Sequence, residues 1–443
     1  MGTYLSRTPS SEGNRKTFTF STWVKRSKMS GQQTILLGYN GNNNLGYNAL
    51  VFKTNNQLAL GGWSFDWLVS TAIFRDPSAW YHIVLAVNTP DSTANDRIKL
   101  YVNGTQLTDF GTRNNPSQND DFAINDDVEH NIGSRSAYNS SDYLDGYLAE
   151  CYMIDGQALA PTSFGQTDST TGIWTPKTYS GSYGTNGFRL EFKNAGALGT
   201  DTSGNTNTWT VNNAGTGAQV VDTPSNVFAT LNPVAGAYNN NTTIVKGALQ
   251  STTGGDNSQY FASMGVTKGK WCWEVKLNGG DMAIGLFNKI PSVAIGMGGN
   301  DYSVMAQLYY TAGGSSGAVN RYQYNSTNYY NIPVGFGNDD SGTIYQFLLD
   351  LDSGTKTWIV RRAGDASTQG SFTLPSGFLN GDFIIPGYSV TSSWPATEQQ
   401  WNFGNPPHSI ASGNSDANGY GNFEYAVPSG YYALCTENLN TYG

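Results

Sequence analysis

The chain has 443 residues, of which 38% are hydrophobic, 13% aromatic and 13% charged, and its formal net charge is −9. This length predicts about two to three domains, and many aromatics with few charges exclude intrinsic disorder, which has the opposite composition. The acidic balance and the lack of a long Lys/Arg run argue against nucleic acid as a partner. No stretch approaches the ~18 apolar residues of a membrane-spanning helix, so we expect no membrane insertion.

Apolar and polar residues alternate along most of the chain, which is typical of half-buried β-strands. In chain order, clear examples lie at residues 18–24, 81–87, 98–102 and 270–275, and the last apolar run lies at 431–435. Asn-Gly and Asp-Gly pairs, which tolerate the positive φ of tight hairpins, fall between the runs. The sequence contains no long amphipathic helix and no heptad repeat. It therefore predicts an all-β chain with two antiparallel β-sandwich (jelly-roll) domains in tandem.

The composition changes over residues 196–227, which are rich in Gly, Thr and Asn and hold few large apolar side chains. Such a segment is typical of a connector. We therefore predict a first sandwich over residues 1–195, a connector over 196–227 and a second sandwich over 228–443. Trp209 and Val211 are the apolar residues of the connector that can pin it to either sandwich.

The three cysteines, Cys151, Cys272 and Cys435, are an odd number, which argues against a disulfide framework. Cys272 lies between two tryptophans in a predicted strand, where a buried free thiol is expected. Together with the absence of a signal peptide at the N-terminus, this predicts folding in a reducing cytoplasm.

Four segments in the first half resemble laminin-G/concanavalin-like jelly rolls, and six in the second half resemble SPRY-type sandwiches. The first set is FTFSTWVK at 18–25, WYHIV at 80–84, KLYVNG at 99–104 and DGYLAECYMI at 145–154. The second set is GKWCWEV at 269–275, IGL at 284–286, VGFG at 334–337, LLDLDSG at 348–354, IPGY at 385–388 and WNFG at 401–404.

Further segments resemble virion proteins in phages of aquatic bacteria, cyanophages among them, which are described as structural or tail-fibre proteins. These segments are YLSRTP at 4–9, YGTNGF at 183–188, DTSGN at 201–205, DTPSN at 222–226 and PSGY at 428–431. The resemblance implies a structural protein on the outer surface of a bacteriophage particle, assembled in the bacterial cytoplasm.

Concanavalin-like folds also host glycoside hydrolases, whose retaining members need two carboxylates about 5 Å apart. Glu150 and Glu274 each stand alone on a predicted strand, without a second carboxylate on the same face. The three histidines, His82, His130 and His408, have no partner at zinc-ligand spacing. We therefore predict that the protein is not an enzyme and that both glutamates are structural.

Aromatic residues in loop-like sequence are the candidate binding residues. Their rings offer large contact areas with a polar handle, which suits sugar or protein surfaces. They are equally able to pack the sandwiches or an intersubunit contact, and both readings stay open. These residues are Trp63, Trp67, Tyr309, Tyr310, Tyr329, Tyr330 and Trp394.

Calcium is the one cofactor that the sequence raises. Acidic residues crowd residues 120–129, and Asp126 and Asp127 are the weak calcium candidates there. Calcium takes several oxygen ligands, but the spacing matches no EF-hand, and acidic loops are usually solvated.

Three functions remain. The first is a non-enzymatic tail fibre, appendage or knob that contacts the host envelope through glycan or protein surfaces. The second is a capsid decoration (cement) protein that stabilises the particle, and the third is a glycan-degrading enzyme. Without a heptad stalk, we expect the sandwiches to contact copies of this chain or other virion proteins; closed symmetry is usual, and trimers are common among the phage fibres that it resembles.

Overall fold

The structure is a computed structural model that describes residues 2–139, 141–215, 217–235, 242–253, 258–278, 282–290, 301–308, 321–329, 341–390 and 397–443. Strands dominate, and the one α-helix of the described residues is α1 (Thr436–Tyr442). Among the same residues, no helix combines the length and apolar character needed to cross a bilayer. The prediction of a β chain built from antiparallel sheets is confirmed.

The chain divides into two compact units. The first comprises Met1–Gln219 with Thr223–Ser225, and the second comprises Val220–Asp222 with Asn226–Gly443. Residues 196–219, expected to be a connector, thus lie within the first unit. The reason is local: Trp209 is buried and packs edge-on against Phe188, with ring centroids 5.0 Å apart. The short strand that follows Trp209 then extends a sheet of the first unit.

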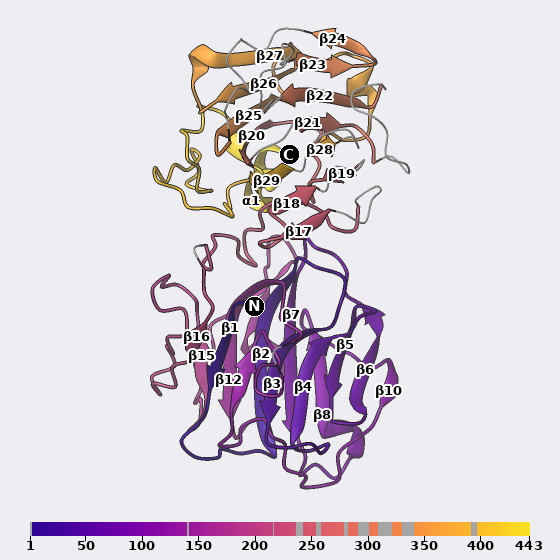
Figure 1. The fold of residues 1–443 in the computed structure, drawn as a ribbon. Helices are drawn as coiled ribbons and strands as arrows, with labels where there is room; N and C mark the ends of the chain where they lie inside the picture. Colours follow the sequence, from indigo (N-terminus) through magenta and orange to yellow (C-terminus); the bar gives the residue numbers. More distant parts are fainter. Residues whose placement is uncertain are drawn as a thin grey trace. The chain divides into compact units, whose positions relative to one another are not determined.

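In the described part of the first unit, two sheets face each other (Figure 1). The larger has eight strands in the order β10 (Phe110–Arg113), β6 (Asp66–Ile73), β5 (Gln57–Gly61), β4 (Tyr47–Phe52), β3 (Gln33–Tyr39), β11 (His130–Ile132), β1 (Tyr4–Arg7) and β16 (Thr210–Asn212). The smaller has six in the order β15 (Phe188–Leu190), β12 (Gly146–Asp155), β2 (Thr17–Arg26), β7 (Trp80–Asn88), β8 (Ile98–Val102) and β9 (Thr105–Gln106). A separate hairpin joins β13 (Gly165–Thr167) to β14 (Trp174–Pro176).

The described residues of the second unit also form two sheets. One runs in the order β17 (Thr243–Val245), β18 (Gln250–Thr253), β29 (Thr397–Asn402), β20 (Lys270–Asn278), β25 (Ile344–Asp350), β26 (Thr357–Arg362) and β27 (Gln369–Thr373), and β30 (Tyr432–Ala433) pairs with β20 in parallel. The other runs in the order β19 (Ser258–Phe261), β28 (Ile385–Val390), β21 (Met282–Phe287), β22 (Ser303–Leu308), β23 (Arg321–Tyr324) and β24 (Thr327–Tyr329). Short 3₁₀ turns lie at η1 (Ala94–Asp96), η2 (Pro161–Ser163), η3 (Ala366–Thr368) and η4 (Phe378–Asn380).

Alternation along each strand decides which side chains form the core. In the larger sheet of the first unit, Leu50, Leu60 and Leu68 pack inward against the smaller sheet. Their neighbours Ala49 and Val69 lie on the opposite, outer face. Burying one Leu side chain stabilises a fold by about 1.5–3 kcal/mol, so a one-residue slip in register would be strongly disfavoured.

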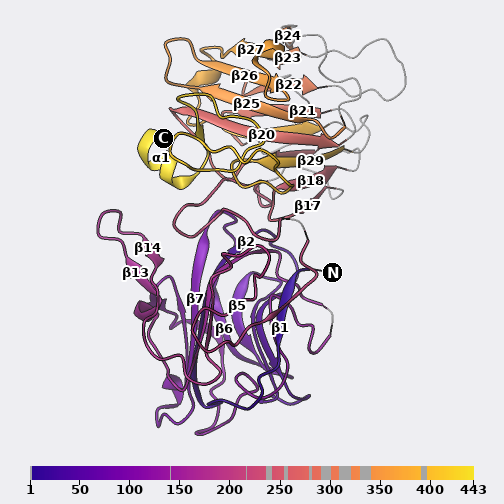
Figure 2. The same ribbon diagram turned by 90° about the vertical axis from the view of Figure 1, so that its left-hand side faces the viewer.

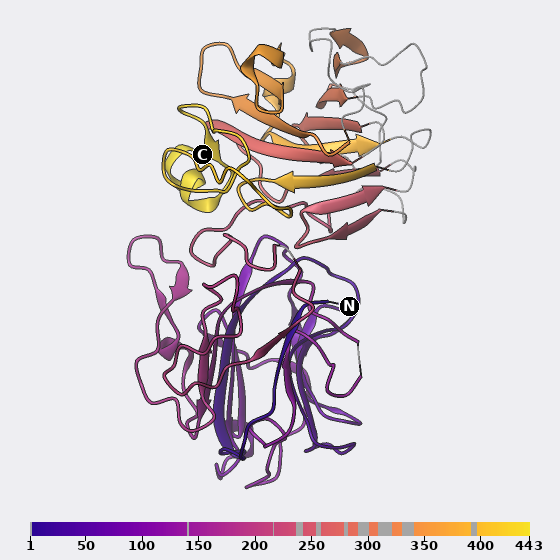
Figure 3. The ribbon, with the colours of Figure 1, turned by 60° about the vertical axis from the view of Figure 1, so that its left-hand side comes forward.

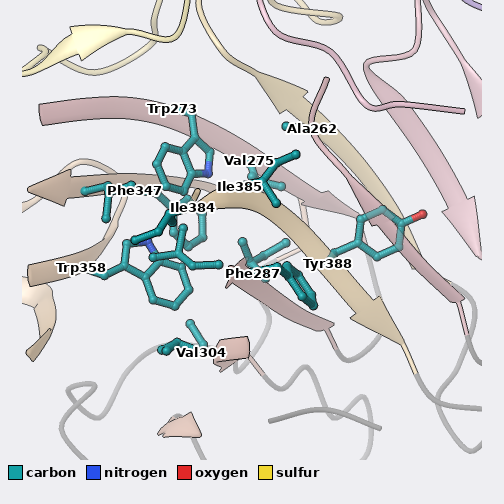
Figure 4. Close-up of a cluster of buried hydrophobic side chains, with 14 of the residues drawn as sticks. Ala262, Trp273, Val275, Phe287, Val304, Phe347, Trp358, Ile384, Ile385 and Tyr388 are labelled. Atoms are coloured by element: carbon teal, nitrogen blue, oxygen red, sulfur yellow. The ribbon is translucent and has the colours of Figure 1, made fainter. Parts of the chain in front are cut away.

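Stacked aromatic rings fill the core of the second unit. Figure 4 shows Trp273, Phe347 and Trp358 together between the two sheets. Trp273 and Phe347 stack with centroids 5.7 Å apart, and Phe347 and Trp358 with centroids 5.9 Å apart. All three rings are fully buried, so they contribute to stability and not to a surface.

Outer sheet faces in both units are covered by segments that follow the strands in sequence. In the first unit, residues 156–187 cover the smaller sheet, and Figure 2 shows their β13–β14 hairpin beside β7. In the second unit, residues 404–433 lie over β20 and β25, where Gln346 donates to the Ala426 carbonyl. Figure 3 shows this C-terminal segment in yellow against the strands of the second unit.

Candidate functional site

Of the predicted aromatic binding residues, Trp63 is the one that the structure places on an open surface of the first unit. Its side chain is 37% exposed. Trp67 is buried beside Phe65 and Phe122, with centroids 4.7 and 5.6 Å away, so it belongs to the core and its prediction as a surface residue is corrected. A β-bulge between β5 and β6 turns Trp67 inward.

Of the predicted binding residues in the second unit, the structure describes Tyr329. Tyr329 is 38% exposed at the edge strand β24 and packs edge-on against Phe372, with centroids 4.9 Å apart. Tyr309, Tyr310, Tyr330 and Trp394 lie outside the described residues.

Trp63 belongs to a cluster of four aromatic rings on the outer face of the larger sheet. We call Tyr39, Tyr47, Trp63 and Tyr138 the aromatic patch. Trp63 lies edge-on to Tyr47 and Tyr138, with centroids 5.9 and 5.1 Å away. Tyr138 also contacts Tyr39 and Tyr47 edge-on, at 5.4 and 5.6 Å. Edge-to-face contacts of this kind hold each ring in a defined orientation.

Two loops bring the first three rings together. Tyr39 and Tyr47 are paired in register across the β3–β4 turn. The Asn43 Oδ1 shapes this turn by accepting hydrogen bonds from the backbone N–H groups of Leu45 and Gly46, at 3.1 and 2.7 Å. Asparagine favours such local turns because its side chain reaches its own backbone.

The β5–β6 loop, which carries Trp63, is fastened to the same turn. The Asn44 Oδ1 accepts hydrogen bonds from the backbone N–H and the hydroxyl of Ser64, both at 3.1 Å. Trp63 therefore stands beside the asparagine-rich turn and not as an isolated exposed ring.

Tyr138 comes from a segment that crosses the outer face between β11 and β12. We call residues 134–139 and 141–145 the strap. Arg135 fastens it by an ion pair with Asp142 (2.9 Å) and a hydrogen bond to the Tyr47 hydroxyl (3.3 Å). The Thr34 backbone N–H donates to the Asp142 carbonyl at 2.9 Å, which ties the strap to β3.

The charged side chains beside the aromatic patch are paired with side chains of opposite charge. The Arg135 charge lies 5.5 Å from the Tyr138 ring centroid and is matched by Asp142. Burial raises the pKa of Tyr47, so its phenol stays neutral at physiological pH. The nearby carboxylate of Asp66 is paired with Lys53 at 2.5 Å.

The two calcium candidates, Asp126 and Asp127, have different surroundings. The Asp126 carboxylate is buried and accepts from Asn40 Nδ2 (2.5 Å), forms an ion pair with Arg15 (3.2 Å) and accepts from the Asp127 backbone N–H (2.9 Å). Asp127 is exposed. Among the described residues, no three His, Cys, Asp or Glu side chains gather as a metal site would require. Asp126 instead links its own loop to Arg15 and Asn40.

Glu150, one of the two glutamates weighed for catalysis, lies in a bulge of β12 at a φ of 49°. Its carboxylate pairs with Arg189 at 3.0 Å and accepts a hydrogen bond from the Tyr152 hydroxyl at 2.6 Å. Arg189 also pairs with Glu191 at 2.8 Å. The two carboxylates thus share one guanidinium, which is an arrangement typical of a structural clamp.

Glu274 is fully buried on β20 and holds the C-terminal segment. Its Oε1 accepts from the Tyr425 backbone N–H (2.8 Å), and its Oε2 accepts from the Glu424 backbone N–H and Asn402 Nδ2 (both 3.0 Å). Burial raises the pKa of Glu274 to about 7; the three N–H donors lower it but do not offset the loss of water, and the neighbouring Glu424 charge raises it further.

The histidines have structural surroundings as well. His82 lies between Trp23 and Trp174, with ring centroids 4.8 and 6.0 Å away. Its Nδ1 accepts from Trp174 Nε1, so its proton is on Nε2, which contacts the Ser21 hydroxyl; both distances are 2.9 Å. Burial lowers the pKa of His82 to about 3 and that of His130 to about 4, so both rings stay neutral at physiological pH.

Sequence reasoning missed three of the four rings of the aromatic patch. Tyr39 and Tyr47 bracket an asparagine-rich turn, and that bracketing was a usable signal. Tyr138 is distant in sequence from Trp63, and nothing in the pattern indicates that the strap folds back over β3 and β4.

Comparison with known proteins agrees with the fold of the first unit. Residues 2–163 match the model of a family described as the concanavalin A-like lectin/glucanases superfamily. No curated protein matches. The chain is similar to the SPRY domain of human HERC1 at 15% identity and a TM-score of 0.28, covering 39% of this chain and 96% of that one.

Two further solved structures are similar to this chain. One is a putative carbohydrate binding protein from Bacteroides ovatus, at 16% identity and a TM-score of 0.31, covering 48% of this chain and 58% of that one. The other is domain 4 of AbnA, an extracellular arabinanase from Geobacillus stearothermophilus, solved with arabinotriose, at 21% identity and a TM-score of 0.26, covering 34% of this chain and 65% of that one. The family match places a concanavalin-like domain in the first part of a nearly all-β chain.

Proposed function

We propose that this chain is a non-enzymatic binding protein on the outer surface of a bacteriophage particle, and that it contacts the host envelope through the aromatic patch. The observation that carries the binding proposal is the exposure of Trp63 within a ring cluster whose geometry is fixed from three separate segments. A preorganised aromatic surface loses little conformational entropy when it binds. Single exposed apolar residues are ordinary, but a fixed group of four rings with a polar rim is not.

The concanavalin-like first unit is compatible with binding, but a fold by itself does not establish function. The virion location rests on the sequence segments that resemble phage structural proteins, such as residues 4–9 and 201–205. The second of these segments is a compact loop here. The Asp201 carboxylate accepts from the backbone N–H groups of Arg189 and Asn207, at 2.9 and 2.7 Å. Such a loop serves the stability of the unit, and the aromatic patch serves contact with other molecules.

The absence of catalysis is part of this proposal. The Glu150 carboxylate is committed to Arg189 and Tyr152, and the Glu274 carboxylate to three N–H donors. A general acid or nucleophile in a glycosidase must face the scissile bond; Glu274 is fully buried, and the partly exposed Glu150 carboxylate is held by Arg189 and Tyr152. Incubation with laminarin, alginate or host polysaccharide is expected to release no new reducing or unsaturated ends.

The experiment that tests the proposed function has two arms. Immunogold electron microscopy of purified particles with antibody against this chain is expected to label the outer surface. The purified chain is expected to bind host cells and to compete with phage adsorption, and Trp63→Ala is expected to weaken both effects at least tenfold. Particles without label, together with host binding that Trp63→Ala leaves unchanged, would refute the proposal.

A further inference from the structure

We propose that the ligand of the aromatic patch is a neutral saccharide, recognised by ring stacking on Trp63 and by amide donors from the asparagine-rich β3–β4 turn. This inference rests on the proposed function and names the chemical class of its ligand. Three observations lead to it: the size of the open surface, the state of the nearby charges and the unused donors at its rim.

The exposed part of the patch is small. Trp63 is the one ring of the patch that is more than a third exposed; Tyr39 and Tyr138 are partly buried, and Tyr47 is 6% exposed. An aromatic side chain offers roughly 150–250 Å² when fully exposed, so Trp63 at 37% presents about 90 Å², and each partly buried tyrosine adds less than that. A stable protein interface needs about 800 Å² from each partner. The exposed rings by themselves therefore match one or two sugar rings and are too small to form a protein interface on their own.

The charges around the patch are already matched. Arg135, the cation that contacts the rings, gives its NH2 group to Asp142 and Ser141 and its NH1 group to the Tyr47 hydroxyl. An anionic sugar would have to displace Asp142 to reach this guanidinium. The chain also carries a net charge of −9, which repels polyanions at long range. A neutral ligand meets neither obstacle.

The rim presents hydrogen-bond donors that the fold leaves unused. Asn42, Asn43 and Asn44 each use the side-chain oxygen inside the protein: Asn42 accepts from the Tyr39 hydroxyl at 2.7 Å, Asn43 from the turn backbone and Asn44 from Ser64. Among the described residues, their three Nδ2 groups make no hydrogen bond. Because each oxygen is held, each NH₂ group has a fixed direction.

These donors match the acceptor oxygens of sugar hydroxyls, and a flat aromatic face matches the apolar C–H face of a sugar ring. Both kinds of contact converge on one place, since Ser64 fastens the Trp63 loop to Asn44. Stacking supplies most of the affinity and the amides select the pattern of hydroxyls, as in other small-molecule sites where few polar groups fix orientation.

Two substitutions in the β3–β4 turn remove an amide donor and keep the oxygen acceptor beside it. Asn42→Asp and Asn44→Asp keep the oxygen that accepts from Tyr39 or Ser64, so the turn keeps its hydrogen bonds, but the unused Nδ2 donor is lost. Asn119→Asp is the matched control, because Asn119 is an exposed asparagine at a φ of 67° whose side chain has no hydrogen bond among the described residues. Ile173→Ala, at a 59% exposed residue in the β13–β14 hairpin, is the control for loss of exposed apolar surface.

The full chain is applied to an array of neutral hexose oligosaccharides (glucose-, galactose- and mannose-based) and of uronate-containing and sulfated oligosaccharides, and hits are measured by calorimetry. We expect neutral oligosaccharides to bind, with affinity that is unchanged between low and high salt. Trp63→Ala is expected to weaken this binding at least tenfold, and Trp63→Phe less. The Asn42→Asp/Asn44→Asp double variant is expected to weaken it by about three- to tenfold or more, while both controls bind like the wild type.

Thermal melting of every variant separates loss of binding from loss of folding. Binding of uronate or sulfated glycans that depends on Trp63 would overturn the neutral-sugar inference and leave the proposed function standing. So would Trp63-dependent binding of purified host-envelope protein without binding of any glycan. Host-cell binding that no substitution in the patch affects would overturn both.

Discussion

Glu274 makes the stability of the second unit depend on pH in an unusual direction. Its pKa rises from the ordinary value of 4.5 to about 7 in the folded protein because the carboxyl is buried. Below pH 4.5 the group is protonated in both the folded and unfolded states, so it has no effect there. Between pH 4.5 and 7 the unfolded chain releases the proton first, so the free energy of unfolding falls as pH rises.

The size of this effect follows from the two pKa values. They differ by about 2.5, and each pKa unit corresponds to ~1.4 kcal/mol, which gives a loss of about 3 kcal/mol of stability by pH 7 and above. Glu274→Gln cannot ionise, so this loss disappears. The variant instead leaves one of the three N–H donors without an acceptor, which costs about 1–3 kcal/mol at every pH.

The assay is urea unfolding at pH values from 4.5 to 8, followed by tryptophan fluorescence. The wild type minus variant difference in unfolding free energy is expected to fall by about 3 kcal/mol from the acid to the neutral end. His408 acts in the opposite direction: burial lowers its pKa to about 4, so its contribution is present above pH 6.5 and is lost as pH falls through 4. For this reason the wild-type profile alone is expected to be flatter than that of Glu274→Gln.

A matched control is Asp382→Asn, which removes an exposed carboxylate from the same unit. Its profile is expected to run parallel to that of the wild type. A wild type minus Glu274→Gln difference that stays constant across the pH range, or that rises with pH, would show that Glu274 is ionised in the folded protein at pH 5 and that the burial argument fails.

Three further outcomes follow from the packing. A Cβ at Gly165 would lie 2.5 Å from the Trp174 ring. Gly165→Ala is therefore expected to lower the free energy of unfolding by about 1–3 kcal/mol and to make the β13–β14 hairpin sensitive to limited proteolysis. An unchanged cleavage pattern would contradict this. Trp209→Ala removes a buried ring and is expected to cost about 3–5 kcal/mol and to open residues 196–219 to protease, whereas the wild type stays uncut there. All three cysteines are buried, so a thiol reagent such as DTNB is expected to react with none in the folded protein and with three in denaturant; fast reaction of any native thiol would contradict this.

Much of the fold could be predicted because strand alternation is a local property. The strand at residues 18–24 and the one at 81–87 pair side by side, and their apolar faces point inward as the pattern required. The extent of the connector could not be predicted from composition. A single buried ring, Trp209, outweighs the polar residues around it, because its burial stabilises more than a flexible segment gains in entropy.

The aromatic patch was less accessible to sequence reasoning than the fold. Trp63 and Trp67 have the same kind of sequence surroundings, and the bulge that separates an exposed ring from a buried one is a feature of strand pairing, not of composition. The partners of Trp63 come from two other segments, and only tertiary structure brings Tyr138 into contact with it. The residue type thus indicated aromatic contacts, and the pairing of β5 with β6 determined that Trp63 is exposed and Trp67 is buried.

The rings of the aromatic patch and the inner core lie on opposite faces of the larger sheet, although Leu45, Phe65 and Leu144 in the same loops and strap pack against that core. Tyr39, Trp63 and Tyr138 stand on one side of β3 and β4, and Leu36 and Leu50 pack on the other. Changes at such separated positions are close to additive in their effect on stability. The exposed rings of the patch can therefore be varied with little effect on the inner core, whereas changes at Leu45, Phe65 or Leu144 in the same segments are expected to disturb it.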